Sequence, residues 1–257
     1  MPKNPDTTKW SQLLIEAVQT PGLISDAYHA FHGYSLGNRM LALAQCHLRG
    51  LTPGPISTYR GWQEKGRQVR KGEKAIILCR PVTRSFENEQ GEEKTITTGF
   101  IERPFWFVLS QTDGEPIEFP PTPAWDRSRA LAALDIREVP FTDFDGNTLG
   151  YARGREIAIS PLSPMPHDTT FHELGHIVIG HCSEGEFHDN PFTTRNLKEV
   201  EAEAVALICC ESLGLPGAEY ARGYIQNWII GDVIPEKSAQ KIFHAADQIL
   251  KAGQGNE

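Results

Sequence analysis

The feature that most constrains this chain is the pentapeptide His-Glu-Leu-Gly-His at residues 172–176. Two histidines four residues apart project from the same face of a helix, so both imidazoles can reach one metal ion. The glutamate beside the first histidine is then placed to hold a water molecule at that ion. The pentapeptide predicts a helix with His172 and His176 as metal ligands and Glu173 as general base. Such a helix is typical of the catalytic site of a zincin-type zinc hydrolase, and among these hydrolases we expect a metallopeptidase.

The neighbouring residues favour a helix over residues 170–180. Asp168 or Thr170 can cap its N-terminus, and Thr170 and Glu173 have the spacing of a capping box. Three apolar residues repeat at helical spacing and supply a buried stripe: Phe171, Leu174 and Val178. The plain alternative is an ordinary helix that carries two surface histidines.

A hydrolytic zinc site needs a third protein ligand and keeps its fourth position open for water. In a metzincin the third ligand is a histidine in H-E-x-x-H-x-x-G-x-x-H. Here Ile179 stands where that glycine would be, and Gly180-His181 is out of register. The spacing therefore excludes the metzincin class.

A better source of the third ligand is the predicted helix that contains Glu199-Val-Glu-Ala-Glu203. Glu199 and Glu203 lie one turn apart on one face. We therefore predict Glu199 as the ligand and Glu203 as the residue that orients a ligand histidine through its second ring nitrogen. The alternatives are Glu201 as ligand, or an acidic cluster that merely forms a solvated helix face.

The sequence leaves two parts of this site open. The side chains available to stabilise a tetrahedral oxyanion are Tyr151, His181, His188 and Tyr224, and each has a packing or surface role as its alternative. The metal is expected to be Zn²⁺, with Mn²⁺ or Co²⁺ as the other divalent candidates.

Composition bounds the cellular setting. The N-terminus does not read as a secretion signal and no apolar run is long enough to span a bilayer, so we expect a cytoplasmic protein without a membrane partner. The five cysteines are odd in number and contain no C-x-x-C pair. We expect them to be reduced packing residues rather than a disulfide framework or a cysteine zinc site.

The net charge of −8 is unevenly distributed. Residues 1–84 hold twelve Lys and Arg against five Asp and Glu, whereas the remaining residues hold thirteen against twenty-eight. This asymmetry predicts two functional halves and an anionic partner for the first. Residues 111–126 contain four prolines and little periodicity, which is typical of a linker. We therefore predict domains at 1–110 and 127–257.

The segment from Thr58 to Arg84 holds eight Lys and Arg against two Glu. Clustered cations neutralise phosphates, and aromatic faces stack on bases of any kind, so this mixture suits single-stranded nucleic acid. The predicted stacking residues are Tyr59 and Trp62, and the predicted cationic contacts are Arg60, Lys65, Arg67, Arg70, Lys71 and Lys74. The alternative is a solvated basic surface with aromatic residues in the core.

The pattern of apolar and turn residues predicts an α+β protein. Helices are expected at 10–18, 35–48, 58–63, 127–134, 170–180, 197–213, 218–230 and 236–251. Strands are expected at 75–79, 95–101, 105–110, 137–141 and 156–160, with a polar loop around 87–93.

Motifs along nearly the whole chain resemble one known family. In the first half they are Tyr34-Ser35, Asn38, Thr58-Tyr59-x-x-Trp62 and Gly66-Arg-Gln-Val-Arg-Lys-Gly-Glu-Lys74-Ala-Ile. In the second they are Ile157–Pro161, Phe171-His-Glu-Leu-Gly-His176, Gly180-His181, Glu199-x-x-Ala-Glu203 and Tyr224-Ile-Gln-Asn-Trp228. The chain with these motifs is similar to the ArdC antirestriction family. Its members join an N-terminal single-stranded-DNA-binding domain to a C-terminal zincin-like metallopeptidase domain.

The resemblance implies a protein of a plasmid or other mobile element that protects incoming DNA from host restriction. It implies single-stranded DNA as a partner, with host restriction enzyme subunits or a repressor as possible protein partners. Two alternatives remain open. In the first, the chain is a non-catalytic DNA-binding decoy with a structural metal site. In the second, it is a regulatory metallopeptidase that cleaves a repressor.

Overall fold

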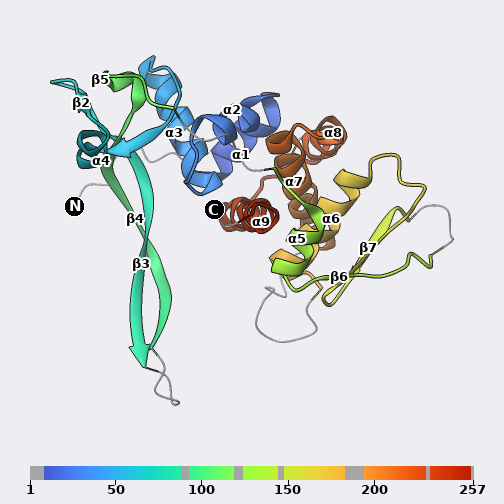
Figure 1. Ribbon diagram of the computed structural model, residues 1–257. Helices are drawn as coiled ribbons and strands as arrows, with labels where there is room; N and C mark the ends of the chain where they lie inside the picture. Colours follow the sequence, from blue (N-terminus) through green and yellow to red (C-terminus); the bar gives the residue numbers. More distant parts are fainter. Residues whose placement is uncertain are drawn as a thin grey trace. The chain divides into compact units, whose positions relative to one another are not determined.

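The computed structural model describes residues 9–87, 93–118, 124–143, 148–182, 194–229 and 232–255. Helices and strands are mixed along the chain (Figure 1), as the α+β prediction requires. The chain forms two compact units. The helical unit comprises Met1–His29, Ser35–Gly37 and Pro121–Glu257, and the ribbon unit comprises Ala30–Tyr34 and Asn38–Pro120.

The start of the chain belongs to the helical unit, whereas the sequence predicted a single N-terminal domain of residues 1–110. The reason is the packing of α1 (Trp10–Gln19), whose apolar face is buried against α8 (Ala218–Ile229) and α9 (Glu236–Gly253). The Glu236 carboxylate accepts hydrogen bonds from the backbone N–H groups of Trp10 and Ser11 at 2.9 and 3.0 Å. Both ends of α1 are thus tied to the helical unit, since the Arg222 guanidinium donates to the carbonyl of Ala17. The next helix, α2 (Leu23–Ala30), was not predicted.

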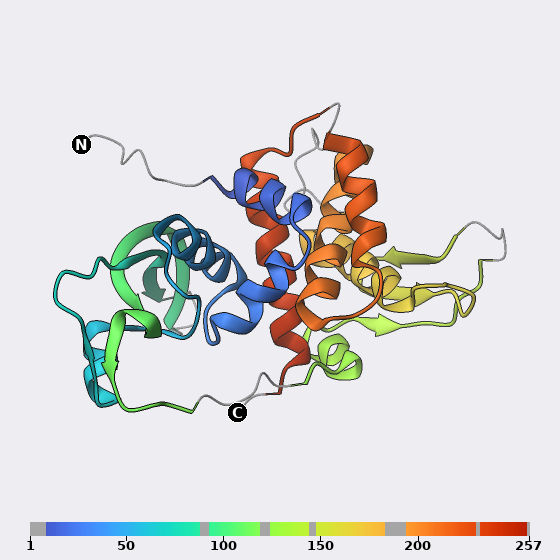
Figure 2. The same cartoon turned by 90° about the horizontal axis from the view of Figure 1, so that it is seen from above.

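The centre of the helical unit is the pair α6 (Pro166–Ile179) and α7 (Arg195–Leu213), which lie side by side with α9 in Figures 1 and 2. A short helix, α5 (Arg127–Ala133), packs on α9. A small sheet of order β6-β8-β7 contacts α6 through β7 and β8. Its strands are β6 (Arg137–Glu138), β7 (Gly150–Arg153) and β8 (Glu156–Ile159).

The N-terminus of α6 differs from the prediction. The helix begins at Pro166, so Asp168 lies in its first turn, Thr170 follows in the second, and neither is the N-cap. The Thr170 hydroxyl donates to the carbonyl of Pro166 at 2.6 Å instead of capping. Proline is favoured at the first helical position because the N–H that it lacks would have no partner within the helix.

Gly175 permits the close approach of α6 and α7. A Cβ atom at this position would lie 3.2 Å from both the Ala202 Cα and the Val205 Cβ of α7. Real Cβ atoms seldom come this close to a neighbour, so any larger residue would push the two helices apart. The glycine inside the pentapeptide is therefore explained by packing.

The ribbon unit contains α3 (Leu36–Arg49) from Asn38 onward and a sheet of order β1-β4-β3. The strands are β1 (Ile56–Thr58), β3 (Ile76–Glu87) and β4 (Glu93–Val108). Beside this sheet lie α4 (Tyr59–Glu64) and a pair formed by β2 (Arg67–Val69) and β5 (Thr112–Gly114). The buried side chains at the base of the sheet include Ile76, Leu78, Trp106 and Val108.

Strands β3 and β4 form one long antiparallel hairpin (Figure 1) where the sequence predicts three shorter strands. The register shifts between Ile76 and Ile77 and between Val82 and Thr83. Such bulges interrupt the alternation of apolar and polar residues, so a continuous strand reads as separate pieces. The predicted loop falls largely on residues 88–92, which lie outside the described residues.

We predict that Gly175→Ala lowers the free energy of unfolding by about 1–3 kcal/mol, because the added methyl overpacks the contact between α6 and α7. The matched control is Gly223→Ala in α8, where nothing lies within 4 Å of an added Cβ. That substitution should stabilise the chain by about 0.5–1 kcal/mol. Urea denaturation measures both, and equal effects would contradict the packing role of Gly175.

Candidate metal centre and candidate nucleic-acid interface

His172, His176 and Glu199 bring three ligand atoms together. The two Nε2 atoms of the histidines lie 3.1 Å apart. Glu199 Oε2 lies 3.5 Å from His172 Nε2 and 3.6 Å from His176 Nε2. Within the described part of the chain, these three residues form the one His/Cys/Asp/Glu group compact enough to hold a metal ion.

The spacing of the three atoms fits a tetrahedral cation. Ligand atoms about 2.0–2.1 Å from a tetrahedral ion lie about 3.3–3.4 Å from one another. The three observed separations of 3.1, 3.5 and 3.6 Å bracket that value. Two imidazoles and one carboxylate are also a donor set that zinc and other divalent transition metals accept, and they leave one position for water or substrate.

Glu203 lies behind the first histidine. Its Oε1 atom is 3.5 Å from Nδ1 of His172, the ring nitrogen that faces away from the ligand cluster. Burial lowers the pKa of His172, but hydrogen bonds to Glu199 and Glu203 outweigh it and raise the pKa to about 10. Hydrogen bonds to His172 and His176 in turn hold the pKa of the Glu199 carboxyl below its usual range. The carboxylates are therefore arranged to stabilise positive charge at this point.

Glu173 is a buried residue of α6, the helix that also carries His172 and His176. Its carboxylate faces the start of β7. A Cβ atom on Gly150 would lie 3.1 Å from Glu173 Oε1, so the absence of a side chain there leaves room for the carboxylate. Burial raises the pKa of Glu173, whereas the neighbouring His172 and His176 lower it. A raised pKa suits a carboxylate that accepts a proton near neutral pH.

Glu201, the alternative third ligand, does not belong to the cluster. Its side chain is 1% exposed and accepts a hydrogen bond from Nε2 of His181 at 2.8 Å. The other nitrogen of His181 lies 2.9 Å from Nδ1 of His176. His181 is therefore packed behind a ligand and does not face the substrate side, which removes it from the candidates for oxyanion stabilisation.

Of the other three oxyanion candidates, Tyr224 is the one whose pKa responds to the carboxylates of the cluster. Burial raises the pKa of its phenol, and the charges of Glu199 and Glu203 raise it further. Tyr151 packs against Phe141 and under the Arg153 guanidinium, which lies 4.6 Å from its ring centroid. His188 lies outside the described residues.

The structure shows that three predicted DNA contacts have structural roles. Trp62 is completely buried and donates a 2.8 Å hydrogen bond to the carbonyl of Phe107, so it offers no face for a base. The Arg67 guanidinium donates hydrogen bonds to Thr112 and Gly114 of β5 and to Glu115, which follows that strand. Arg70 likewise donates to Glu73, Asp113 and the carbonyl of Ser110. The net charge of the segment does not distinguish the two arginines from free cations.

The remaining predicted contacts lie at the surface. Tyr59 is 45% exposed, and its hydroxyl accepts a hydrogen bond from Gln68. The four cations among these contacts, Arg60, Lys65, Lys71 and Lys74, are exposed. Arg60 forms an ion pair with Glu64 one turn along α4.

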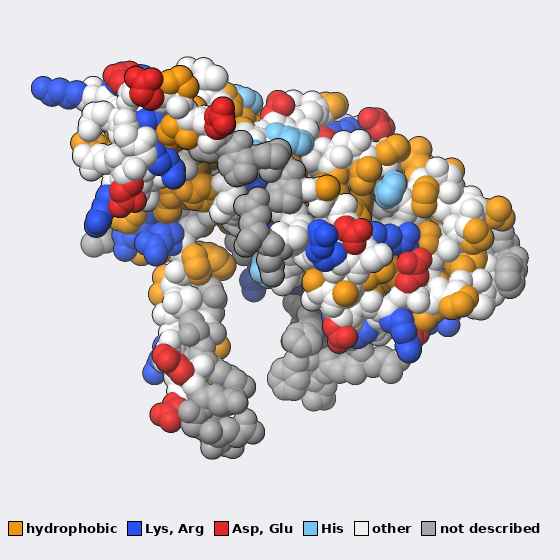
Figure 3. All heavy atoms as spheres, viewed as in Figure 1, with side chains coloured by type: hydrophobic (Ala, Val, Ile, Leu, Met, Phe, Trp, Pro, Cys, Tyr) orange, Lys and Arg blue, Asp and Glu red, His pale blue; other side chains and the backbone are white. Residues whose placement is uncertain are grey.

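The hairpin of β3 and β4 separates charge between its two faces. Register and alternation place Arg80, Arg84 and Arg103 on one face, which continues the buried face of Leu78. The opposite face carries Glu87, Glu93 and Glu102. The cationic face also carries four partly exposed apolar side chains: Val82, Phe86, Ile96 and Ile101. Figure 3 shows further Lys and Arg side chains in the ribbon unit near the base of the hairpin.

Arg80 and Arg84 lie within the basic segment but were not among the predicted DNA contacts. Arg103 lies outside that segment. The signal that links the three is the antiparallel pairing, which sets Leu78 opposite Arg103 and Arg80 opposite Ile101. This pairing is not readable from composition.

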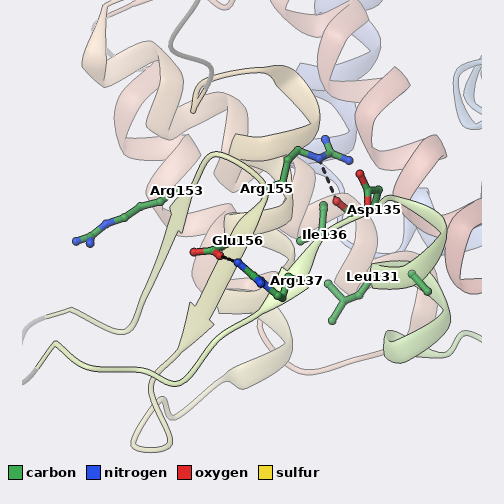
Figure 4. Close-up of a pocket in the computed structure, with 8 residues that line it drawn as sticks. Leu131, Asp135, Ile136, Arg137, Arg153, Arg155 and Glu156 are labelled. Carbon is green, nitrogen blue, oxygen red and sulfur yellow. Dashed lines mark hydrogen bonds and ion pairs between the residues drawn. The ribbon is translucent and has the colours of Figure 1, made fainter.

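A surface cavity of about 560 Å³ lies in the helical unit between α5 and the small sheet (Figure 4). Arg137 forms an ion pair with Glu156 there, and Arg155 donates to the carbonyls of Leu134 and Asp135. Arg153 points away from the other labelled residues in Figure 4. None of the metal ligands lines this cavity, and all three of its arginines have partners, since Arg153 lies over the Tyr151 ring.

Residues 7–106 match the model of the N-terminal domain of anti-restriction factor ArdC. The fold is similar to the metal-free crystal structure of the antirestriction ArdC protein from plasmid R388, with 24% identity, a TM-score of 0.53 and coverage of 95% of this chain and 94% of that chain. The Mn(II)-bound structure of the same protein gives 22% identity, a TM-score of 0.53 and coverage of 96% and 99%. Residues 7–106 therefore resemble the ArdC N-terminal domain, and the chain as a whole has an ArdC-like fold.

At these identities the likeness to the R388 protein establishes the shared fold of the ArdC-like chain. No curated protein sequence matches it significantly. No helix of the described residues is long and apolar enough to cross a membrane.

We predict that Arg67→Lys in this ArdC-like chain lowers the free energy of unfolding by about 1–2 kcal/mol, because lysine cannot reproduce the fork of hydrogen bonds to β5. Arg60→Lys, at an exposed position, should change it by less than about 0.5 kcal/mol. Urea denaturation of both variants tests this. If the two substitutions have the same effect, Arg67 has no special structural role.

Proposed function

We propose that this chain is a divalent-metal-dependent peptidase of the two-histidine, one-glutamate type, acting in the cytoplasm to protect incoming DNA from restriction. The observation that carries this proposal is the meeting of His172, His176 and Glu199 with the buried Glu173 beside them. The Mn(II)-bound state of the R388 ArdC protein supports a divalent metal in an ArdC-like fold. Zn²⁺ is the expected ion on donor chemistry, with Mn²⁺ or Co²⁺ as alternatives.

The residues of the chain supply defined steps of peptide hydrolysis. When bound, the divalent cation would supply Lewis acidity at the three ligands, polarising a carbonyl and making water more acidic. Glu173 would take a proton from the attacking water and pass it to the leaving amine. The phenol of Tyr224 is the candidate group to donate a hydrogen bond to the oxyanion.

Strand β7 offers a place for a peptide substrate. It forms one side of the order β6-β8-β7 and pairs, among the described residues, with β8 alone. An extended peptide can add to such an edge through backbone hydrogen bonds. Gly150, the first residue of β7, also lies next to Glu173 Oε1, so an added strand would pass the general base.

A second function, the binding of single-stranded DNA, is favoured by the cationic face of the hairpin. Arg80, Arg84 and Arg103 share that face with Phe86, whereas the carboxylates lie on the opposite one. Arginines neutralise phosphates and an exposed aromatic ring stacks on a base, which together suit a flexible single strand. Lys65, Lys71 and Lys74 extend the exposed positive charge of the ribbon unit.

We propose that the division of labour follows the two compact units. The helical unit would hold the peptidase site and the ribbon unit would hold the DNA. Restriction enzyme subunits of the host are the protein substrates that best explain both activities in one chain. A repressor is the alternative substrate.

For the peptidase, we predict that Glu173→Gln lowers the rate of hydrolysis of an unstructured protein by about 10²–10⁴-fold, because the general base is lost. Metal content should be retained, since the three ligands are unchanged. Glu219→Gln, at an exposed position of α8, is the matched control and should keep full activity. Chelation should abolish hydrolysis, and addition of Zn²⁺ or Mn²⁺ should restore it.

Two outcomes would contradict the peptidase proposal: hydrolysis by Glu173→Gln at the rate of the wild-type chain, or no hydrolysis by any metal-loaded chain. Substrate capture with Glu173→Gln then separates the targets. Recovery of restriction subunits supports the proposed substrate, and recovery of a repressor favours the alternative. A transfer assay into restricting and non-restricting hosts shows whether protection needs Glu173 or only the DNA-binding surface.

For DNA binding, we predict that replacing Arg80, Arg84 and Arg103 together by Gln weakens binding of a single-stranded oligonucleotide. The slope of log K against log salt should shrink by about 2, since three phosphate contacts are lost. The matched control replaces Glu87, Glu93 and Glu102 by Gln and should keep the slope. Equal slopes in the two variants, or tighter binding of a duplex than of the single strand, would count against this surface.

A further inference from the structure

Behind the ligand His176 lies a buried chain of hydrogen bonds that neither metal ligation nor the general base explains. His176 Nδ1 lies 2.9 Å from His181 Nδ1, and His181 Nε2 lies 2.8 Å from Glu201 Oε2. The side chains of His181 and Glu201 are 2% and 1% exposed. Burial of a carboxylate is costly, and Glu201 Oε1 has no hydrogen-bond partner among the described residues. Such a costly arrangement calls for a specific role.

The chain has one arrangement of protons that suits a metal ligand. A carboxylate only accepts, so Nε2 of His181 must donate to Glu201. In this arrangement Nδ1 of His181 accepts a hydrogen bond that Nδ1 of His176 donates. This leaves Nε2 of His176 with a bare lone pair, directed toward His172 Nε2 at 3.1 Å and Glu199 Oε2 at 3.6 Å. The buried chain thus selects the tautomer of His176 that can bind a cation.

The alternation of glutamates on α7 fits the same picture. Glu199 is the ligand, and Glu203, one turn on, faces Nδ1 of His172 at 3.5 Å. Glu201, between them, points to another side of the helix and reaches His176 through His181. Each ligand histidine is therefore backed by a carboxylate, directly in one case and through an imidazole in the other.

The turn that ends α6 brings His181 into this position. Gly180 has φ of +96°, the left-handed conformation that favours glycine. Its N–H donates to the carbonyl of Ile177 at 3.1 Å, and the N–H of His181 donates to the carbonyl of His176 at 2.8 Å. This pair of bonds is a Schellman motif, which folds the chain back so that His181 packs against the side chain of His176.

We propose that His181 and Glu201 are positioning residues that hold His176 in the orientation and tautomer required for metal binding. The proposal rests on the proposed function, since it needs a cation at His172, His176 and Glu199. It goes further because it gives Gly180-His181 and Glu201, the middle glutamate of α7, a role in the affinity of the site for the metal. Loss of such a partner of a metal ligand typically costs about 10–100-fold in metal affinity.

The test measures the dissociation constants for Zn²⁺ and for Mn²⁺ by competition with a chelator, using the full metal-stripped chain. His181→Leu should weaken Zn²⁺ binding by about 10–100-fold. Glu201→Gln, which can still accept from His181, should weaken it less. His244→Leu, at an exposed position of α9, is the matched control and should bind Zn²⁺ like the wild-type chain.

His181→Leu also leaves the Glu201 carboxylate buried without its partner, which will destabilise the fold. The double variant His181→Leu with Glu201→Leu separates the two effects. It removes the unpaired charge, so its unfolding should return toward that of the wild-type chain, yet its affinity for Zn²⁺ should stay low. Recovery of affinity together with stability would mean that the pair is only structural, and would overturn the proposal.

A spectroscopic readout is independent of affinity. In the Zn²⁺-loaded wild-type chain, the Nδ1 proton of His176 should give a nuclear magnetic resonance signal protected from exchange with water. In His181→Leu that protection should be lost. If the wild-type chain binds neither Zn²⁺ nor Mn²⁺, the proposed metal function and this proposal both fail. If it binds and His181→Leu binds equally well, this proposal alone fails.

Discussion

The close contact of α6 with α7 is the constraint on which the candidate metal centre depends. His172, His176 and Glu173 project from α6, whereas Glu199, Glu201 and Glu203 project from α7. The distances from His172 and His176 to Glu199 therefore depend on how far apart these two helices lie. Small residues at the crossing, Gly175 and Ala202, set that separation by letting backbone approach backbone. The ligand atoms come together because Gly175 has no side chain and Ala202 has only a methyl group where the two helices touch.

The grouping of His172, His176 and Glu199 could be predicted from the sequence because helical periodicity is regular. A spacing of four residues places His172 and His176 on one face, and the same spacing joins Glu199 to Glu203 and leaves Glu201 elsewhere. The role of His181 was not readable, because it depends on the left-handed turn at Gly180 after the helix has ended. The start of α6 was also missed, since Pro166 competes with Asp168 and Thr170 as a helix signal.

The ribbon unit was less predictable because exposure is a tertiary property. Trp62 and Tyr59 are equally good stacking residues in a sequence, yet one is fully buried and the other lies at the surface. Arg67 and Lys71 count alike toward net charge, although the first is consumed by backbone carbonyls of β5. The two faces of the hairpin emerge only from the pairing of β3 with β4, whose bulges hide the alternation.

The crowding of carboxylates around α6 and α7 has a consequence for the folding of the helical unit. Burial, and then the charge of Glu203, raise the pKa of Asp168 to about 7, and the pKa of His172 is raised to about 10. The folded chain thus retains protons where negative groups converge. A cation that binds only the folded state would add about 1.4 kcal/mol of stability for each tenfold rise in its concentration above the dissociation constant. Thermodynamic linkage would then make the supply of metal in the cell a determinant of how long the protein persists.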